Sequence, residues 1–271
     1  HKDGNLNSLS CNKVRMIVID HLRENIVWFA TLEGGVDKYN TKTGEFKHYR
    51  YDPLKINGLS TDRIVSMYED KYGLIWIGTE FGGLNILNPE TEKITIHRHN
   101  PDNPYSISSD IIYPFYEDRN GIMWIGTYKG LNRYDRQSKR FYRYYHDPAN
   151  ESSMSSDMIF SIYQDKKGLY WLATMGGGIN KFNPITGQAK YYTEVNGLPN
   201  DVVYSTIEDK YGNFWLSTNF GISKFNPNDE SFINYDVKDG IQSHEFNFGA
   251  ALIDEDGELF FGGMNGFNAF Y

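Results

Sequence analysis

Hydrophobic and polar residues alternate in short runs that predict strands and tight turns along the whole chain. Between residues 64 and 97 the runs predict four strands, at Ile64–Glu69, Leu74–Gly78, Leu84–Leu87 and Ile94–His97. In the second strand the isoleucines point to one face and Trp76 and Gly78 point to the other, because successive side chains alternate. Both faces are apolar or small, so we expect this strand to be covered on both sides.

Glycine and proline signals separate these strands. Gly73 ends the turn Asp70–Gly73, where a glycine is free to take the positive φ that a tight hairpin needs. The dipeptide Asn88-Pro89 predicts the turn between the third and fourth strands. Together these signals predict an antiparallel sheet of four sequential strands.

All five tryptophans occupy one repeated position. They are separated by 44 to 48 residues, and Phe260 continues the series: Trp28, Trp76, Trp124, Trp171 and Trp215. Each lies in the pattern Asp-x-x-Gly-x-x-Trp, whose aspartates are Asp70, Asp118, Asp165 and Asp209, with degenerate copies at Asp20 and Asp254. The chain is therefore a tandem repeat of six copies.

The repeat length predicts the architecture. A small residue two places after the tryptophan, such as Gly78 or Ala173, leaves room beside the ring for a side chain from the next sheet. Four-stranded sheets of about 45 residues, each buried against its neighbours, stack as the blades of a β-propeller. The structural alternative, a strand-rich solenoid, has shorter repeats of about 20 to 29 residues. We expect an all-β fold, a β-propeller of four-stranded antiparallel blades with six visible repeats.

The repeats also set the expected boundaries. We expect a remnant of a preceding blade at 1–8 and blades at 9–58, 59–106, 107–153, 154–197, 198–240 and 241–271, the last incomplete. Because His1–Ser8 aligns with the tail of a fourth strand at His146–Ser153, we expect the chain to be cut from a longer one. Either six blades form a ring with an imperfect seam or a seventh is missing.

Charge and cysteine content narrow the possible functions. Lys and Arg total 27 against 35 Asp and Glu, a net charge of −8 that repels nucleic acids and anionic membranes. With Cys11 as the only cysteine, neither a disulfide within the chain nor a cysteine-based metal site can form. We expect no cofactor, no metal and no nucleic-acid partner for this chain.

Candidate ligand residues lie on the loops between the second and third strands, which differ from copy to copy while the scaffold repeats. These loops carry Glu80, Phe81, Tyr128, Lys129, Met175, Asn219, Phe220 and Asn265. Aromatic rings beside hydrogen-bonding groups suit a sugar, whose C–H face packs on a ring while its hydroxyls pair with amides and carboxylates. Ordinary loop side chains and a protein contact surface remain alternatives.

Two aligned positions lie at the entrance of the first strands. One holds Asn12, Asp62, Asp110, Asp157, Asp201 and His244, which could form a ring for a cation or sugar hydroxyls, although we favour aspartates that cap their own turns. The next holds Arg15, Tyr113, Phe160, Tyr204 and Asn247. Because these residues differ strongly, we predict that they line an axial pocket, with Arg63 as a further candidate.

The turn aspartates, two histidines and a basic cluster are expected to be structural. The recurring turn aspartates are spread over separate blades, so no two are expected to approach the roughly 5 to 10 Å of a glycosidase pair. His97 and His99 lack a third metal ligand and are expected on a solvated edge strand. The basic cluster Arg136–Arg143 is expected to form local salt bridges or an interface. No Gly-Lys-Ser/Thr phosphate loop and no Gly-x-Ser-x-Gly elbow occurs.

The repeat text resembles a known family. Leu59-Ser60, then Asp-x-x-Gly-x-x-Trp-Ile-Gly-Thr, then Gly-Gly-Leu-Asn ending at Asn85 is similar to the two-component regulator propeller repeat. The last copy adds His244-Glu245-Phe246-Asn247 and the run Gly257–Gly263, similar to the family's terminal blade. The resemblance covers residues 9–271. It implies the C-terminal six blades of the second of two seven-bladed propellers.

That resemblance implies a function as well. It identifies the chain as part of the periplasmic sensor region of a Bacteroides-type hybrid two-component system histidine kinase/response regulator. The implied ligand is a glycan-derived oligosaccharide whose binding regulates polysaccharide-utilisation genes. The implied partners are an adjoining propeller and sandwich domain, with a homodimer left open and membrane contact only through a missing downstream helix.

Two other function classes remain open on the sequence. A propeller lyase or glycosidase would need a clustered acid and base, and only the neighbours His244 and Glu245 offer one. Adjacent residues on a strand point to opposite faces, which weakens the hypothesis of an enzyme that uses this pair. A protein-interaction scaffold is the third class. We predict a sensor without catalysis of its own.

Overall fold

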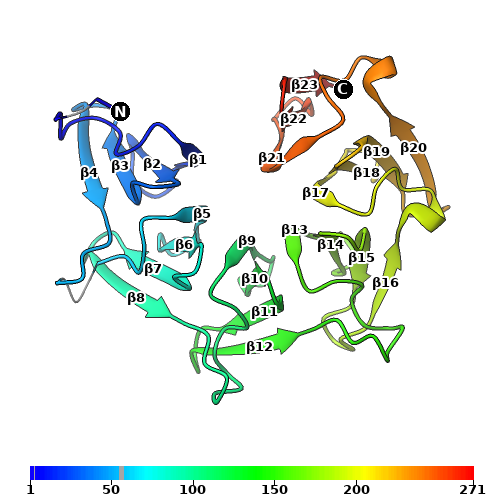
Figure 1. Ribbon diagram of the computed structural model, residues 1–271, viewed down its shortest axis with the longest axis horizontal. Helices are drawn as coiled ribbons and strands as arrows, with labels where there is room; N and C mark the ends of the chain where they lie inside the picture. Colours follow the sequence, from blue (N-terminus) through cyan, green and yellow to red (C-terminus); the bar gives the residue numbers. More distant parts are fainter. Residues whose placement is uncertain (3, 55–57) are drawn as a thin grey trace. The chain divides into compact units, whose positions relative to one another are not determined.

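The computed structural model describes residues 1–2, 4–54 and 58–271. Residues 3 and 55–57, within the ranges assigned to the N-terminal remnant and the first blade, lie outside the described residues. The described chain forms 23 strands and two short 3-10 helices, so the expected all-β fold is confirmed. The strands form six antiparallel sheets of propeller-blade type, five with four strands and one with three (Figure 1).

The chain divides into two compact units, His1–Arg143 and Tyr144–Tyr271. Sheet 1 of the first unit consists of β1 (Val14–Ile19), β2 (Ile26–Thr31), β3 (Val36–Asn40) and β4 (Glu45–Tyr49). Sheet 2 consists of β5 (Ile64–Glu69), β6 (Ile75–Thr79), β7 (Leu84–Asn88) and β8 (Lys93–His97). Sheet 3 consists of β9 (Ile112–Glu117), β10 (Met123–Thr127), β11 (Gly130–Asp135) and β12 (Arg140–Tyr144).

The second unit holds the other three sheets and both short helices. Sheet 4 consists of β13 (Ile159–Gln164), β14 (Tyr170–Thr174), β15 (Ile179–Phe182) and β16 (Ala189–Tyr192). Sheet 5 consists of β17 (Val203–Glu208), β18 (Phe214–Thr218), β19 (Gly221–Asn226) and β20 (Ser231–Tyr235). Sheet 6 consists of β21 (Phe246–Ile253), β22 (Leu259–Gly263) and β23 (Gly266–Phe270), and the helices are η1 (Glu194–Asn196) and η2 (Val237–Asp239).

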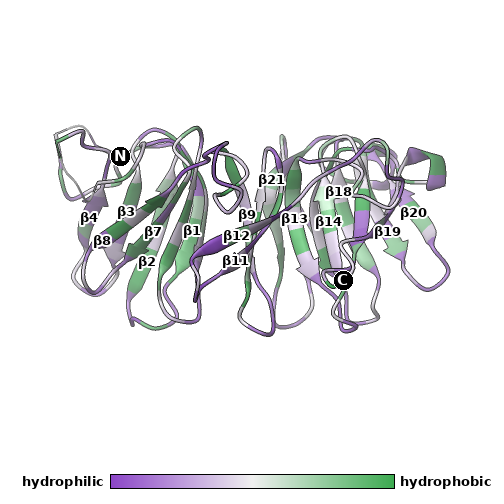
Figure 2. Cartoon of the chain, turned by 90° about the horizontal axis from the view of Figure 1, so that it is seen from below, coloured by the Kyte–Doolittle hydropathy of each residue, from purple (hydrophilic) through white to green (hydrophobic). Residues whose placement is uncertain are grey.

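The strands follow the sequence pattern closely. In sheet 2 each strand pairs antiparallel with the next, and the four predicted strands agree with the observed ones to within one residue. Gly73 has a φ of 74°, as predicted for its turn. Figure 2 shows hydrophobic residues concentrated along the strands and hydrophilic residues at the turns. Each sheet thus has a turn end, where the Asp-x-x-Gly hairpins lie, and an opposite loop end.

The tryptophans are buried, and Trp28, Trp76, Trp171 and Trp215 pack between consecutive sheets within one unit. Four of the five are at most 1% exposed and Trp215 is 8% exposed. The Trp76 ring lies edge-on to Tyr134 of the next sheet, with ring centroids 5.3 Å apart. In the second unit Trp171 contacts Phe225 of the next sheet at 5.6 Å. The prediction that these rings wedge between neighbouring sheets is confirmed in both units.

Gly78, the small residue two places after Trp76, leaves space for the next sheet, as predicted. A Cβ atom added at Gly78 would lie 3.1 Å from Cβ of Ile112 and 3.0 Å from its carbonyl oxygen, in the next sheet. It would also fall onto Ser66 Oγ of its own sheet. The missing side chain therefore lets sheet 3 pack closely on sheet 2.

The Leu-Ser and Asn positions of the repeat meet at the loop end. Asn85 Oδ1 accepts the Ser60 backbone N–H at 2.9 Å, and Asn85 Nδ2 donates to Ser60 Oγ at 2.7 Å. The same side-chain bond joins Asn180 to Ser155 at 2.7 Å. These bonds fasten the segments that enter sheets 2 and 4 to the third strands of those sheets. Among the described residues, no helix has the length and apolar character required to cross a bilayer.

Candidate ligand-binding loops

The turn aspartates are structural, as predicted. Asp70 Oδ1 accepts the backbone N–H groups of Tyr72 and Leu74 at 3.0 and 2.9 Å, and Oδ2 accepts Trp76 Nε1 at 2.8 Å. The same indole bond occurs in the other complete copies, at Asp20, Asp118, Asp165 and Asp209. Each carboxylate thus bonds its own turn and its own tryptophan, and Asp70 also accepts Arg136 of the next sheet.

The aspartates at the entrance of the first strands are also structural, but they do not cap their own turns. Asp62 Oδ1 accepts the backbone N–H of Tyr51 at 2.6 Å, and Asp110 accepts that of His99 at 2.7 Å. Asp157 and Asp201 do the same in the second unit, at 2.6 and 2.7 Å. The predicted structural role is confirmed, but the predicted partner within the same turn is wrong. Each N–H donor lies where the chain leaves the preceding sheet.

His244 departs from this pattern. Its ring stacks on Phe220, with centroids 4.4 Å apart and planes 15° apart. Within the described residues its buried Nδ1 has no hydrogen-bond partner. His244 and Glu245 precede β21, so the assumption that they are neighbours on a strand is wrong.

Aromatic side chains gather at the loop end of the second unit. Phe160 on β13 and Tyr204 on β17 stack with centroids 5.8 Å apart and planes 13° apart. Phe248 on β21 lies 5.4 Å from Phe160. The Tyr204 hydroxyl donates to Asn219 Oδ1 at 3.2 Å, and burial together with nearby Glu245 raises the pKa of that phenol. We call Phe160, Tyr204, Asn219 and Phe248 the aromatic group.

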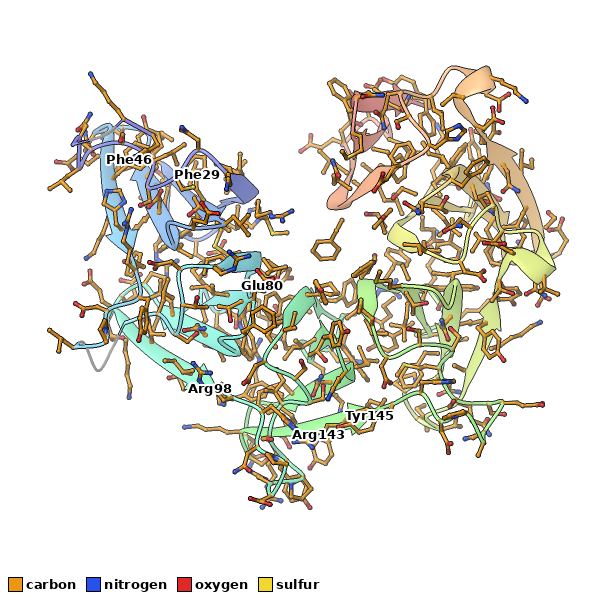
Figure 3. The ribbon with its side chains drawn as sticks, in the orientation of Figure 1. Phe29, Phe46, Glu80, Arg98, Arg143 and Tyr145 are labelled. Atoms are coloured by element: carbon orange, nitrogen blue, oxygen red, sulfur yellow. The ribbon has the colours of Figure 1, made fainter. Side chains whose placement is uncertain are left out.

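The first unit places charged groups at the corresponding end. Glu80 lies in the loop after β6 (Figure 3). Arg63 Nη2 lies 2.6 Å from its Oε2. Burial raises the pKa of Tyr113 on β9, with contributions from nearby Glu80 and Tyr128. These four residues form a second predicted set brought together by the fold, which we call the charged group.

The remaining candidates are more scattered. Arg15 lies exposed on β1, Lys129 lies beside Tyr128 in the loop between β10 and β11, and Asn247 is exposed on β21. Sequence reasoning missed Phe248, the third ring of the aromatic group. Its signal was the phenylalanine one place after Asn247, on a strand whose irregular register hides its alignment with the other copies.

The expectation for His97 is wrong, and that for the basic cluster is confirmed. His97 is half-buried, with its ring 5.8 Å from Tyr134 and 5.3 Å from Phe141, so it does not lie on a solvated edge. Burial, with a contribution from Lys139, lowers its pKa. The basic cluster forms local contacts, as expected: Arg136 bonds carboxylates and Arg143 bonds the carbonyl oxygens of Asn103 and Ser106.

Comparison with protein families gives a match to the two component regulator propeller. The matched residues are 58–81, 106–129, 153–176 and 197–220, and each segment runs from the entrance of a sheet through its second strand. The comparison with curated proteins gave no match.

Solved structures share the fold. Two extracellular domains of putative hybrid two component systems from B. thetaiotaomicron are each 22% identical, with TM-scores of 0.66 and 0.60. The alignments cover 99% and 95% of this chain but only 40% and 41% of those domains. Virginiamycin B lyase from Staphylococcus aureus is 15% identical, with a TM-score of 0.64 over 94% of this chain and 79% of the lyase.

Proposed function

The chain carries two component regulator propeller repeats, and on that premise we propose that it binds a glycan-derived oligosaccharide as part of a sensor. The observation that carries the proposal is the aromatic group. The half-buried ring of Tyr204, stacked on the buried Phe160, and the exposed side-chain amide of Asn219 offer an apolar face and a polar partner together. Pyranose rings pack their C–H faces on such surfaces and pair their hydroxyls with amides.

The charged group supports the same proposal. The Arg63–Glu80 pair presents donors and acceptors to a hydroxylated ligand beside two tyrosines. Both groups are made of residues that differ between repeats, whereas the repeated residues are used by the scaffold. A ligand site needs this asymmetry, because identical copies would offer the same weak contact several times.

A glycan-library binding screen followed by calorimetry tests the proposal. We expect Tyr204→Phe to weaken the bound oligosaccharide severalfold by removing the hydroxyl that bonds Asn219, while Tyr204→Ala abolishes binding. Tyr191→Ala, at a 39% exposed tyrosine on the outer strand β16, is the matched control and should bind normally. Binding that survives Tyr204→Ala unchanged would contradict the site.

We further propose that the sensor role is non-catalytic. The turn aspartates are each held by backbone N–H groups and an indole, which leaves them poorly placed as acid and base. The likeness to a lyase is one of fold at 15% identity. Turnover of a bound glycan that is lost in Glu245→Gln would overturn this part of the proposal.

The wider role is proposed from the relatives. The chain spans about 40% of the length of the solved sensor domains, so kinase control, regulation of polysaccharide-utilisation genes and a periplasmic location are proposals for the whole protein. A transcriptional reporter in cells that carry the full-length sensor should respond to the oligosaccharide and lose that response with Tyr204→Ala. A normal response in that variant would count against the proposal.

A further inference from the structure

A pocket of about 220 Å³ lies at the turn end of the second unit, between sheets 4 and 5. Asp165, Trp171 and Glu208 line it together with Pro227, and Lys181 and Lys210 stand among its other lining residues. It lies at the opposite end of the strands from the aromatic group. We call it the turn-end pocket.

An arginine fills the corresponding place between sheets 2 and 3. Arg136 donates through Nη1 to Asp70 Oδ2 at 2.7 Å and through Nη2 to Glu117 Oε1 at 3.2 Å. Its guanidinium also lies over the Trp76 ring, 5.3 Å from the centroid. Two carboxylates and an indole face thus hold one guanidinium.

A different arginine fills the place between sheets 1 and 2. Arg23, from the turn of sheet 1, donates through Nη1 to Asp20 Oδ2 at 3.0 Å. The same nitrogen lies 3.5 Å from Glu69 Oε1. Arg23 and Arg136 come from different turns, yet their guanidinium groups occupy equivalent places between sheets. The pair of carboxylates, rather than the position of the arginine in the sequence, therefore favours a guanidinium there.

The turn-end pocket keeps the same receiving groups. In the repeat alignment Asp165 corresponds to Asp70, Glu208 to Glu117 and Trp171 to Trp76, while Pro227 stands where sheet 3 has Arg136. Asp165 is only 9% exposed. Among the described residues, its Oδ2 accepts the Trp171 indole at 3.1 Å, and no arginine joins it there.

Four lysines near this pocket define the rest of the ligand. Lys166, Lys167, Lys181 and Lys210 outnumber the two carboxylates, so a second, anionic group on the ligand would be favoured. Lys181 lies over the Trp171 ring at 5.4 Å, but this does not block the place. Lys38 lies over the Trp28 ring in the same way, at 5.5 Å, and Arg23 still fills the place between sheets 1 and 2.

We propose that the turn-end pocket binds the guanidinium group of a ligand that also carries a carboxylate. Asp165 and Glu208 receive the planar N–H donors as Asp70 and Glu117 receive Arg136, because a guanidinium presents a fork that matches paired carboxylates. The lysines receive the carboxylate. Such a ligand is either a small molecule of the arginine type or an arginine flanked by acidic residues in a protein.

Calorimetry on the 271-residue chain with N-acetyl-L-arginine tests the proposal, with N-acetyl-L-citrulline as the isosteric neutral control. We expect the arginine derivative to bind at least about tenfold more tightly than the citrulline, since charge-assisted bonds are lost in the latter. A blocked Asp-Arg-Asp tripeptide forms the second arm. Binding of the tripeptide alone supports a protein source, and no binding of either probe overturns the proposal.

Variants distinguish the pocket from other sites. Pro227→Arg restores the residue type found at position 136 and should fill the pocket from within, which abolishes binding without removing any receiving group. Pro89→Arg is the matched control, because Pro89 aligns with Pro227 but lies between sheets 1 and 2, where Arg23 already fills the place. This variant should leave binding unchanged.

Glu208→Gln is a second test of the pocket, and it does not require the Pro227→Arg variant to fold normally. It should weaken N-acetyl-L-arginine about tenfold while keeping the bond from Tyr163. Binding that persists fully in either pocket variant overturns the proposal. So does a pocket that takes inorganic sulfate in preference to N-acetyl-L-arginine, since the lysines would then be the receiving groups.

Discussion

The turn end and the loop end of the sheets use their polar residues in opposite ways. At the turn end the same aspartate, glycine and tryptophan recur, and each aspartate bonds its own turn and indole. At the loop end the aligned residues range from Arg15 to Phe160, and several present groups that the scaffold does not use. The difference shows which residues the repeated scaffold uses.

Repeated structural residues occur at the loop end as well. At the loop end Asp62 and its counterparts also recur, and they fasten one sheet to the exit of the preceding one. At the turn end the departure from the repeat is Arg136, because its aligned position holds proline at Pro89 and Pro227, and the turn-end pocket lies at a place between sheets that no arginine fills among the described residues. At the loop end the residues that vary between copies, and at the turn end a place that lacks the arginine found between other sheets, are therefore the better pointers to function.

Removing a turn aspartate should produce the largest effect. Asp70→Ala deletes the acceptor for two backbone N–H groups, the Trp76 indole and Arg136, and leaves buried donors unpaired. We expect a loss of about 3 to 5 kcal/mol in the free energy of unfolding, measured by urea titration. Tyr128→Ala at the loop end is the control and should change it by less than about 0.5 kcal/mol. Equal losses would remove the distinction between the ends.

Filling the space beside a tryptophan should have the next largest effect. Gly78→Ala places a methyl group against Ile112 of the next sheet and onto Ser66. We expect a loss of about 1 to 3 kcal/mol by the same titration, and a greater loss for Gly78→Ser, because overpacking forces neighbouring groups apart. An alanine variant as stable as the original would show that the close approach of the two sheets has no energetic weight.

Short-range features were predictable from the sequence because the repeat displays them several times. The turn role of Asp70 and Asp165 was predicted, and the structure adds that each also accepts the indole six residues later. Burial on both faces followed from the apolar alternation of the second strand. The repeat length was enough to predict the four-stranded sheets.

Contacts between sheets were harder to predict. The partner of Asp62 lies 11 residues earlier in an irregular exit segment, where no periodicity fixes the backbone. His97 was placed in solvent because its own strand is at the edge of a sheet, whereas Phe141 of the next sheet covers it. Phe248 joined the aromatic group through a register shift in β21 that is larger than the shifts in the first strands of the other copies. Each miss depended on packing that strand alternation does not encode.

Removing an entrance aspartate tests whether the loop end also carries structural energy. Asp62→Ala deletes the acceptor of the Tyr51 backbone N–H, which then turns to solvent at an exposed position. We expect a loss of about 1 kcal/mol in the free energy of unfolding, well below that of Asp70→Ala. Asp62→Asn should recover part of it, since the amide oxygen still accepts. A loss as large as that of Asp70→Ala would make both ends equally structural.

The two ends should lose stability in different pH ranges. At the turn end, burial opposes ionisation of Asp209, but bonds from Asn213 and Trp215 hold its pKa below the ordinary 3.8, so its contribution is lost only as the pH falls below that value. At the loop end, burial lowers the pKa of His97 from its ordinary 6.5, so the unfolded chain takes up the proton first and stability falls as the pH drops through 6.5.

Substitution of His97 isolates the loop-end range. His97→Phe keeps a ring between Tyr134 and Phe141 but cannot take up a proton. We expect the melting temperature of the original chain to fall more than that of the variant between about pH 7.5 and pH 5.5, with parallel behaviour near pH 4 where the carboxylates titrate. Equal falls in the upper range would mean that His97 protonates as easily in the folded chain as in the unfolded one, and that its contact with Phe141 does not shield it from water.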